Sequence, residues 1–272
     1  SSFIDLFNKH GFRTVRIMDL SGDSIHDYSL GILTRNCRER RQTPLQHQTP
    51  GMMQERTSLV MEESLKNFGR NRQLYIIYNN GSHMAFSYPA QAERFTPASC
   101  NMDDPKARLE ETVNAYDNSI RYTDDFLSRL IGLLQQQDAG SAMLYTSDHG
   151  EDIFDDHRHL FLHASPVPSY YQLHVPFIVW TSDTYREKYP EHMDALQKNR
   201  HKSVASNRVV FHSVLDLAGV TTTYVNDSLS VASPSYTEFP RFYLNDHNEP
   251  RSYDDIGLRK EDFEMFGKMG IR

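Results

Sequence analysis

The sequence is poor in the residues that mark several common protein classes. Only two of its 272 residues are cysteines, and Cys37 and Cys100 form neither a C-x-x-C pair nor a zinc-ribbon spacing. One disulfide between them could form, but the spacing does not predict it. No apolar run approaches the roughly 20 residues of a membrane-spanning helix, and the longest runs are strand-sized, such as residues 74–78. The chain is therefore expected to be soluble as given. Because it starts at Ser-Ser-Phe, without methionine or leader, we expect it to be part of a longer protein.

Positive charge is also scarce. The chain has 29 Lys and Arg against 36 Asp and Glu, a formal net charge of −7, and no extended basic stripe. A nucleic-acid partner is therefore not expected. Hydrophobic residues make up 38% and charged residues 24% of the chain, as in ordinary globular proteins. The length suits one large α/β domain or two small domains, and one domain is the default expectation.

Apolar runs and helical stripes alternate along the chain. Strands are predicted at residues 14–18, 74–78, 142–146 and 175–180, and helices at residues 3–10, 57–68, 108–136 and 207–218. Ser2 and Ser206 are predicted helix caps, and Gly11 and Gly219 predicted helix stops. This alternation favours the α/β class, with a mostly parallel sheet and helices on both of its faces.

Two stretches depart from the alternation. Residues 19–50 are rich in Ser, Arg, Gln and Pro, which favours a long surface excursion. The tail after Ser233 is expected to form a small hairpin and a short helix. We therefore expect one main domain over residues 1–232, with an appendage over residues 233–272 packed on it.

Titratable side chains follow two of the predicted strands. His83 comes shortly after residues 74–78, and Asp148 and His149 come directly after residues 142–146. In open α/β sheets ligands bind beyond the carboxyl ends of the strands, so these groups can converge. An Asp and His pair suits zinc or manganese. Catalytic zinc needs about three protein ligands, so either His83, His163 and others complete the site or its missing ligands lie outside this chain.

The same residues also have an ordinary structural interpretation. Asp-His-Gly after a strand is a common turn, in which Asp caps the next helix and Gly supplies a positive φ. The loop at residues 152–163 gathers further ligand-type side chains: Asp155, Asp156, His157, His159 and His163. Most of these are expected to be solvated surface residues.

Three segments together resemble a known family. They are YTSDHGE at 145–151, LHASP at 162–166 and LHVPFIVW at 173–180. Their order and spacing resemble the phosphoethanolamine transferases of the alkaline phosphatase and sulfatase superfamily, which modify lipid A and related envelope glycans. Further similar segments cover nearly the whole chain, at residues 3–18, 81–83, 95–97, 114–124 and 211–215.

The resemblance implies roles for individual residues. Residues 1–232 would be a partial alkaline phosphatase-like catalytic domain. Asp148 and His149 would be ligands of a catalytic zinc, while His83 and His163 would bind the transferring phosphoryl group or a second metal. Glu151 would orient the loop, and His174 would either face the site or serve the start of the following strand.

The chain departs from the family pattern in two places. Residues 81–85 lack the Gly-Pro that follows the family's His, which puts substrate contacts there in doubt. The family's nucleophilic Thr and an acidic zinc ligand precede the segment that residues 3–18 resemble. We therefore expect the nucleophile upstream of Ser1 and the isolated chain to be inactive. The membrane anchor of the family is likewise absent from this sequence.

The implied reaction transfers phosphoethanolamine from phosphatidylethanolamine to an envelope glycolipid or glycan, at the periplasmic face of the bacterial inner membrane. Three alternatives stay open at this point. They are a sulfatase, a phosphoglycerol transferase or other phosphodiesterase of the superfamily, and a non-catalytic binding module that has kept the fold.

Overall fold

The computed structural model describes residues 2–18, 28–42, 50–69, 71–99, 101–163, 168–245, 247, 249–252 and 258–270. These residues form two compact units, Ser1–Asp138 and Ala139–Arg272. The expected appendage at residues 233–272 falls within the second unit, and its boundary at residue 232 stays a prediction. Cys37 is a buried free thiol, whereas Cys100 lies outside the described residues.

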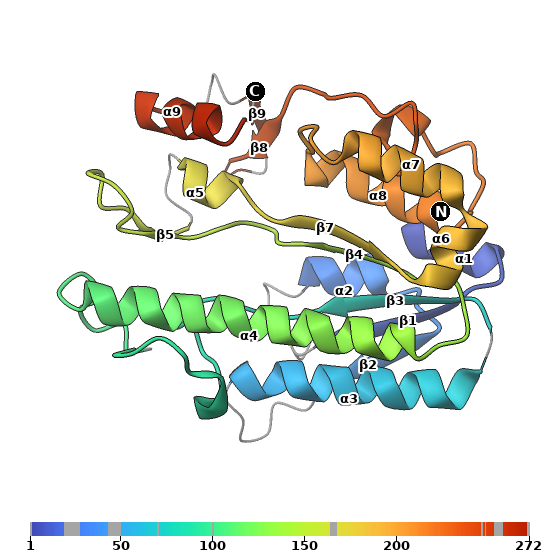
Figure 1. The fold of residues 1–272 in the computed structure, drawn as a ribbon, viewed down its shortest axis with the longest axis horizontal. Coiled ribbons are helices and arrows are strands. Elements are labelled where there is room, and N and C mark those ends of the chain that lie inside the picture. Colours follow the sequence, from blue (N-terminus) through green and yellow to red (C-terminus); the bar gives the residue numbers. More distant parts are fainter. Residues whose placement is uncertain are drawn as a thin grey trace. The chain divides into compact units, whose positions relative to one another are not determined.

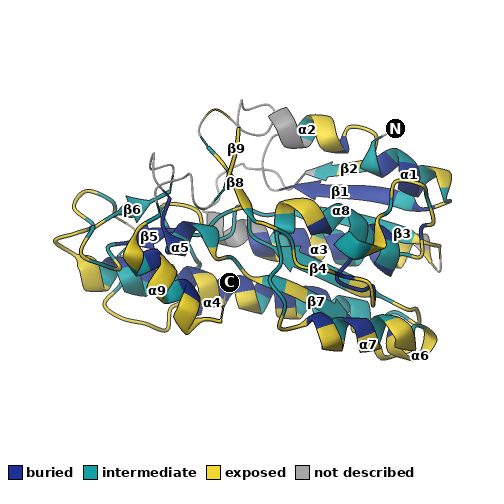
Figure 2. Ribbon diagram, turned by 90° about the horizontal axis from the view of Figure 1, so that it is seen from above, coloured by how far each residue is buried: buried dark blue, intermediate teal, exposed yellow. Residues whose placement is uncertain are grey.

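A parallel sheet forms the centre of the first unit. Its strand order is β2-β1-β3, with β1 at Arg13–Met18, β2 at Glu39–Gln42 and β3 at Gln73–Tyr78. Successive side chains of a strand point to opposite faces, yet every residue from Thr14 to Met18 is buried, as Figure 2 shows for β1. Both faces of this strand are therefore covered, and α1 and α3 both contact it.

The helices of the first unit largely follow the sequence prediction. They are α1 (Phe3–Lys9), α2 (Tyr28–Thr34), α3 (Pro50–Phe68), the 3-10 turn η1 (Ala90–Ala92) and α4 (Leu109–Gln135). Ser2 caps α1 through a capping box with Asp5, and Gly11 follows the helix with φ 78°, both as predicted. The long helices α3 and α4 lie side by side (Figure 1).

The predicted excursion at residues 19–50 is partly regular structure. It contains α2 and the edge strand β2, which pairs with β1. The sequence of β2, ERRQ, has no apolar residue and so gave no strand signal. Ion pairs of Glu39 with Arg13 and Arg41 accompany this strand instead. Residues 19–27 and 43–49 of the excursion lie outside the described part of the chain.

In the second unit, β4 (Ala142–Thr146) pairs with β7 (Phe177–Thr181). The pairing is antiparallel, whereas β1 pairs in parallel with β2 and β3, so the predicted mostly parallel arrangement describes the first unit but not the β4–β7 pair. The reason lies in the connection. Parallel strands need a long crossover, usually a helix, but the only helix described between these strands is the four-residue α5 (Tyr170–Leu173). The other elements described between them are the short strands β5 (Asp152–Ile153) and β6 (Phe161–Leu162).

The rest of the second unit consists of helices and the predicted tail. These elements are α6 (Asp183–Lys188), α7 (Pro190–Asn199), α8 (Ser206–Leu217), η2 (Asp227–Leu229), β8 (Phe242–Leu244), β9 (Pro250–Ser252) and α9 (Lys260–Lys268). The tail hairpin and helix are thus confirmed. Ser206 is the first residue of α8 and not its cap, which is Ala205, whereas Gly219 ends the helix with φ 62° as predicted. None of the helices in the described ranges is both long and apolar enough to cross a bilayer.

Candidate metal centre

The site begins where β4 ends. Because β4 and β7 are antiparallel and Thr146 lies opposite Phe177, the segment after β4 and the segment before β7 meet at one end of this sheet. The Gly150 amide donates to Gln172 O at 2.9 Å. A Cβ on Gly150 would lie 2.1 Å from Tyr171 O, so this glycine is required for space. It does not have the positive φ expected from the turn interpretation.

A short antiparallel hairpin places Glu151 opposite His163. The hairpin strands β5 and β6 pair with Asp152 across from Leu162. Glu151 and His163 directly flank this pair, and Nδ1 of His163 lies 3.0 Å from both carboxylate oxygens of Glu151. The Glu151 side chain is 5% exposed, whereas that of His163 is 29% exposed. The partly exposed imidazole of His163 is therefore hydrogen-bonded to the buried carboxylate of Glu151.

His149 completes a cluster with these two residues. Its ring centroid is 3.9 Å from that of His163. His149, Glu151 and His163 each offer one ligand atom, and these atoms lie within 4.8 Å of one another. Among the described residues, this is the group of three or more ligand-type side chains that could hold a metal ion.

The hydrogen bonds of the two imidazoles fit metal binding. Nδ1 of His149 lies 2.9 Å from Gly150 O, and Nδ1 of His163 contacts the Glu151 carboxylate. Both acceptors require a proton on Nδ1, which leaves the lone pair on Nε2 of each ring. Metal-bound histidines commonly donate their other N–H to a carbonyl or carboxylate in this way. The residues present therefore suit zinc, which binds imidazole nitrogen and carboxylate oxygen.

Asp148 lies beside this cluster. Its side chain is 78% exposed, and its Oδ2 is 3.9 Å from His149 Nε2. Its Oδ1 accepts the His149 amide at 3.1 Å, and Ser147 Oγ donates to His149 O at 2.7 Å. The Asp148 carboxylate is thus near Nε2 of His149. Among the described residues, its contacts include neither Glu151 nor His163.

The other two predicted site residues lie elsewhere in their units. His83 belongs to the first unit, where it is exposed in the turn after β3 and its Nδ1 lies 3.1 Å from Met84 O. His174 belongs to the second unit, where its Nδ1 contacts Tyr170 OH at 2.8 Å and its ring stacks on that of Tyr170. Burial, and to a lesser degree Arg241, lowers the pKa of His174.

The remaining ligand-type residues of the hairpin loop have local partners. Asp155 accepts the Ile153 amide at 2.6 Å, and Asp156 binds the Arg158 guanidinium. His157 lies 3.6 Å from Glu261. These residues therefore build the loop, in line with the expectation that most of them are not ligands.

Sequence reasoning missed the buried carboxylate next to the site. Asp152 is 2% exposed and accepts hydrogen bonds from Ser169 Oγ at 2.6 Å and Gln172 Nε2 at 2.5 Å. Burial raises its pKa, although both hydrogen bonds act in the opposite direction. No local pattern could have identified it, because its two partners are 17 and 20 residues away.

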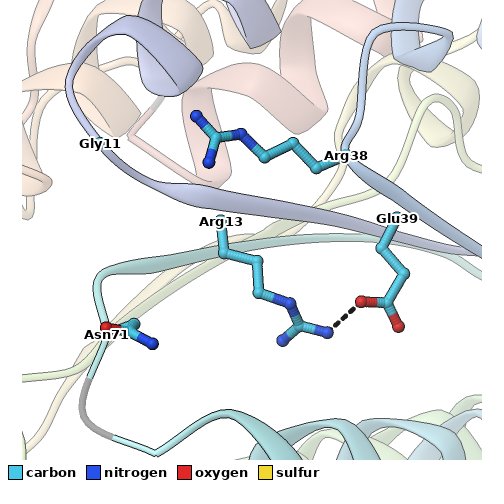
Figure 3. Close-up of a pocket in the computed structure, with 5 residues that line it drawn as sticks. All are labelled: Gly11, Arg13, Arg38, Glu39 and Asn71. Atoms are coloured by element: carbon cyan, nitrogen blue, oxygen red, sulfur yellow. Dashed lines mark hydrogen bonds and ion pairs between the residues drawn. The ribbon is translucent and has the colours of Figure 1, made fainter.

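The first unit has a polar hollow at the amino ends of its strands. Gly11, Arg13, Arg38, Glu39 and Asn71 line it (Figure 3). It lies where β1 and β2 begin, whereas ligand sites of α/β sheets lie beyond the strands' carboxyl ends. Arg13 pairs with Glu39 and also donates to Gln73 and Ser64. The Arg13 and Glu39 side chains that line this hollow bind each other, so we assign it no ligand.

Known proteins similar to this chain share the expected chemistry. Phosphoethanolamine transferase EptA of Salmonella typhimurium is 30% identical over 165 residues, which cover 59% of this chain and 30% of that protein. Kdo(2)-lipid A phosphoethanolamine 7''-transferase of Escherichia coli is 33% identical over 136 residues, covering 47% of this chain and 23% of that protein. The matched segments thus span well under half the length of these two relatives.

The fold has a solved counterpart in the C-terminal periplasmic domain of EptC from Escherichia coli, crystallised as a complex with zinc. The TM-score is 0.72 at 21% identity, over 96% of this chain and 73% of that one. The predicted resemblance and α/β fold class are confirmed. The Sulfatase family model matches residues 1–220, which is most of the sequence. The chain therefore belongs to the Sulfatase family.

Proposed function

We propose that this chain is part of a zinc-dependent phosphoethanolamine transferase. The donor is phosphatidylethanolamine, and the acceptor is an envelope glycolipid or glycan. The reaction takes place at the periplasmic face of the inner membrane, with the membrane anchor outside this chain. The names of the relatives and the zinc-bound EptC domain support this assignment. In the chain itself, the convergence of His149, Glu151 and His163 within 4.8 Å carries the proposal.

The roles of His149, Glu151 and His163 follow from their contacts, whereas Asp148 and His83 keep the roles that the family resemblance implies. His149 and Asp148 hold the metal, and the Gly150 carbonyl fixes the tautomer of His149. His163 binds the transferring phosphoryl group or a second metal, and Glu151 keeps the Nε2 lone pair of His163 directed away from itself. We assign His83 the same role from the family resemblance alone. A zinc ion bound here supplies Lewis-acid stabilisation of the phosphoryl oxygens and lowers the pKa of an attacking hydroxyl.

The catalytic nucleophile is expected in a segment N-terminal to residues 3–18, as the family resemblance implies. Ser147, the hydroxyl nearest to Asp148 along the chain, donates its proton to His149 O at 2.7 Å. An attacking hydroxyl needs a base for that proton, so we assign Ser147 a structural role. Its bond holds the turn that carries His149.

Zinc affinity tests the proposed site. We expect the chain to bind one zinc ion, more weakly than the roughly 10–16 kcal/mol of complete structural sites, because part of the ligand set comes from elsewhere. His149→Ala and His163→Ala should each weaken binding about 10-fold or more. His201→Ala, which changes an exposed histidine in the turn just after α7, is the matched control. The measurement is competition against a chromophoric chelator, with manganese titrated in parallel to compare the two metals.

Equal zinc affinity in all four proteins would contradict the site assignment. The alternatives are separated by assaying the longer protein with a fluorescent phosphatidylethanolamine, a phosphatidylglycerol and an aryl sulfate. Release of diacylglycerol from the first supports the proposal. Turnover of either of the other two substrates alone favours a phosphoglycerol transferase or a sulfatase, and zinc binding without any turnover favours a binding module.

A further inference from the structure

The hairpin between Glu151 and His163 is anchored at its tip by a residue about a hundred positions away. Arg158 lies in the loop between β5 and β6, with 5% of its side chain exposed. Its NH1 donates to Asp262 Oδ2 at 2.6 Å, and its NH2 donates to Asp262 Oδ1 at 2.9 Å. Such a two-point contact fixes direction as well as distance. His157, next to Arg158, adds a weaker contact to α9 through Glu261.

Asp262 is the centre of this anchor. It is fully buried on α9 and also accepts the backbone amides of Tyr170 at 2.7 Å and Arg259 at 3.0 Å. Burial acts to raise the pKa of this carboxyl, but the hydrogen bonds from Arg158, Arg259 and Tyr170 outweigh it, so the pKa is lowered. One ionised carboxylate therefore joins the hairpin, α5 and α9.

The hairpin backbone needs such an anchor. Phe154, His159 and Leu162 have φ values of 58°, 51° and 63°, in the left-handed region that non-glycine residues avoid. Conformations of this kind persist only where the surrounding structure fixes them. Leu162 immediately precedes His163, so relaxation of this strained backbone would move the imidazole off Glu151.

We propose that Asp262 is a positioning residue of the metal centre, which acts through Arg158 to hold Glu151 and His163 in register. Asp262 would act through Arg158 and not by contact with metal or substrate. Because Asp262 lies on α9, this helix supports the site. This inference rests on the proposed function for its zinc readout, but the geometry it describes can be measured without metal.

The experiment compares Asp262→Asn and Arg158→Lys with the whole unaltered chain. The first variant keeps the shape but loses the charge, and the second keeps the charge but loses the two-point fork. Glu264→Gln is the control, because Glu264 lies on the exposed side of α9, where it pairs with Lys260 at 3.0 Å. Three readouts are taken: zinc affinity, hydrogen exchange of the Phe154 amide, and the ¹⁵N signature of the His163 tautomer in metal-free protein. The Phe154 amide is bonded to Leu160 O, so its exchange reports on opening of the hairpin.

Both test variants should weaken zinc binding by about 10-fold, the range seen when groups behind a metal ligand are altered, and Arg158→Lys should be the milder. Exchange of the Phe154 amide should accelerate by about 10-fold while β4 and β7 stay protected, and the single Nδ1–H tautomer of His163 should be lost. Unchanged hairpin exchange and tautomer in Arg158→Lys, or acceleration shared equally by β4 and β7, would overturn the proposal. If the unaltered chain binds no zinc but the metal-free readouts change as described, the proposed function fails and the positioning role of Asp262 stands.

Discussion

At the scale of single residues, the candidate site depends on contacts that leave little room for change. Gly150 separates His149 from Glu151, and its Cα faces the backbone of α5. Any side chain here would meet Tyr171 O at 2.1 Å, and that atom cannot move without displacing the helix. The residue type is set by space between two backbone segments.

Gly150→Ala should therefore destabilise the protein by about 2–3 kcal/mol, as overpacking does in tight sites, and abolish zinc binding. Urea unfolding followed by circular dichroism measures the first effect. Gly132→Ala is the control, because Gly132 lies in the last turn of α4 and nothing lies within 4 Å of the added Cβ. That change should stabilise the helix by up to about 1 kcal/mol. Equal behaviour of the two variants would contradict the packing argument.

A buried polar residue, Asn118, organises the loop after His83. Asn118 on α4 is fully buried and accepts the amides of Arg94 at 2.7 Å and Phe95 at 2.9 Å. Its own amide group donates to Phe95 O and Tyr88 OH. All the polar atoms of this side chain therefore have partners in the loop.

Asn118→Ala should cost about 2–4 kcal/mol, because it leaves two buried amides without acceptors. Asn114→Ala is the comparison, since the more exposed Asn114 makes one side-chain bond, to Pro97 O, and should cost under about 1 kcal/mol. Chemical unfolding measures the stability of both variants. Similar, small losses of stability in both would show that the loop does not depend on Asn118.

At the scale of elements, α7 and α8 are joined by a pair of titratable side chains, His192 and Asp216. His192 Nε2 lies 3.5 Å from Asp216 Oδ1, and Tyr185 OH lies 2.7 Å from His192 Nδ1. Because Tyr185 donates to Leu217 O, it accepts from Nδ1, and the second ring nitrogen faces a carboxylate. This arrangement suits the protonated ring. The hydrogen bond to Asp216 raises the pKa of His192, with burial opposing.

The pKa shifts set the pH dependence of this pair. Burial raises the pKa of Asp216, but hydrogen bonds from His192 and Ser230 outweigh it, so that pKa is lowered. The stabilisation by His192 is therefore fully present below its unfolded pKa of about 6.5 and is lost as pH rises through the raised folded value. The part due to Asp216 is present above about pH 4 and is lost as pH falls through its lowered folded pKa.

His192→Gln should thus lower the free energy of unfolding most between about pH 4 and 6.5, by about 1 kcal/mol. The difference from the unaltered protein should shrink toward pH 9. Unfolding titrations at several pH values give this curve, with His201→Gln as the control. A difference that grows with rising pH would show that His192 is neutral in the folded state.

Sequence patterns predicted helices and strands well where the apolar periodicity is strong. They predicted them poorly where pairing with distant segments determines whether a strand forms and in which direction it runs. The strand at residues 142–146 matches β4 residue for residue, and Ser2 caps α1 as expected. The strand β2 was missed because its stability comes from pairing with β1 and not from apolar residues. The antiparallel direction of β7 depends on what the chain builds between β4 and β7, which no local pattern reports.

In the candidate site, too, residue types could be predicted from the sequence, whereas contacts with distant residues could not. His149 and His163 were identified from residue type and from the family resemblance, and the structure places both in one cluster. The contact between Glu151 and His163 depends on the register of a hairpin with two-residue strands, too short to give a periodic signal. The Arg158–Asp262 anchor joins residues 104 positions apart, so sequence alone could not reveal it.

At the scale of the whole molecule, the proposal assigns this chain the metal and phosphate part of a larger reaction. We therefore expect the chain by itself, with zinc and a fluorescent phosphatidylethanolamine, to release no diacylglycerol. The longer protein should release it, and Asp148→Ala and His149→Ala should abolish that activity. Turnover by the chain alone that disappears in Ser147→Ala would instead make Ser147 the nucleophile.

Anomalous diffraction at the zinc absorption edge, on crystals of this chain grown with zinc, tests the central claim most directly. The account predicts a peak about 2.0–2.1 Å from Nε2 of His149, with Asp148, Glu151 or His163 supplying a further ligand atom. A peak held instead by Asp155, Asp156 or His157, with His149 unbound, would contradict the assignment of this metal centre.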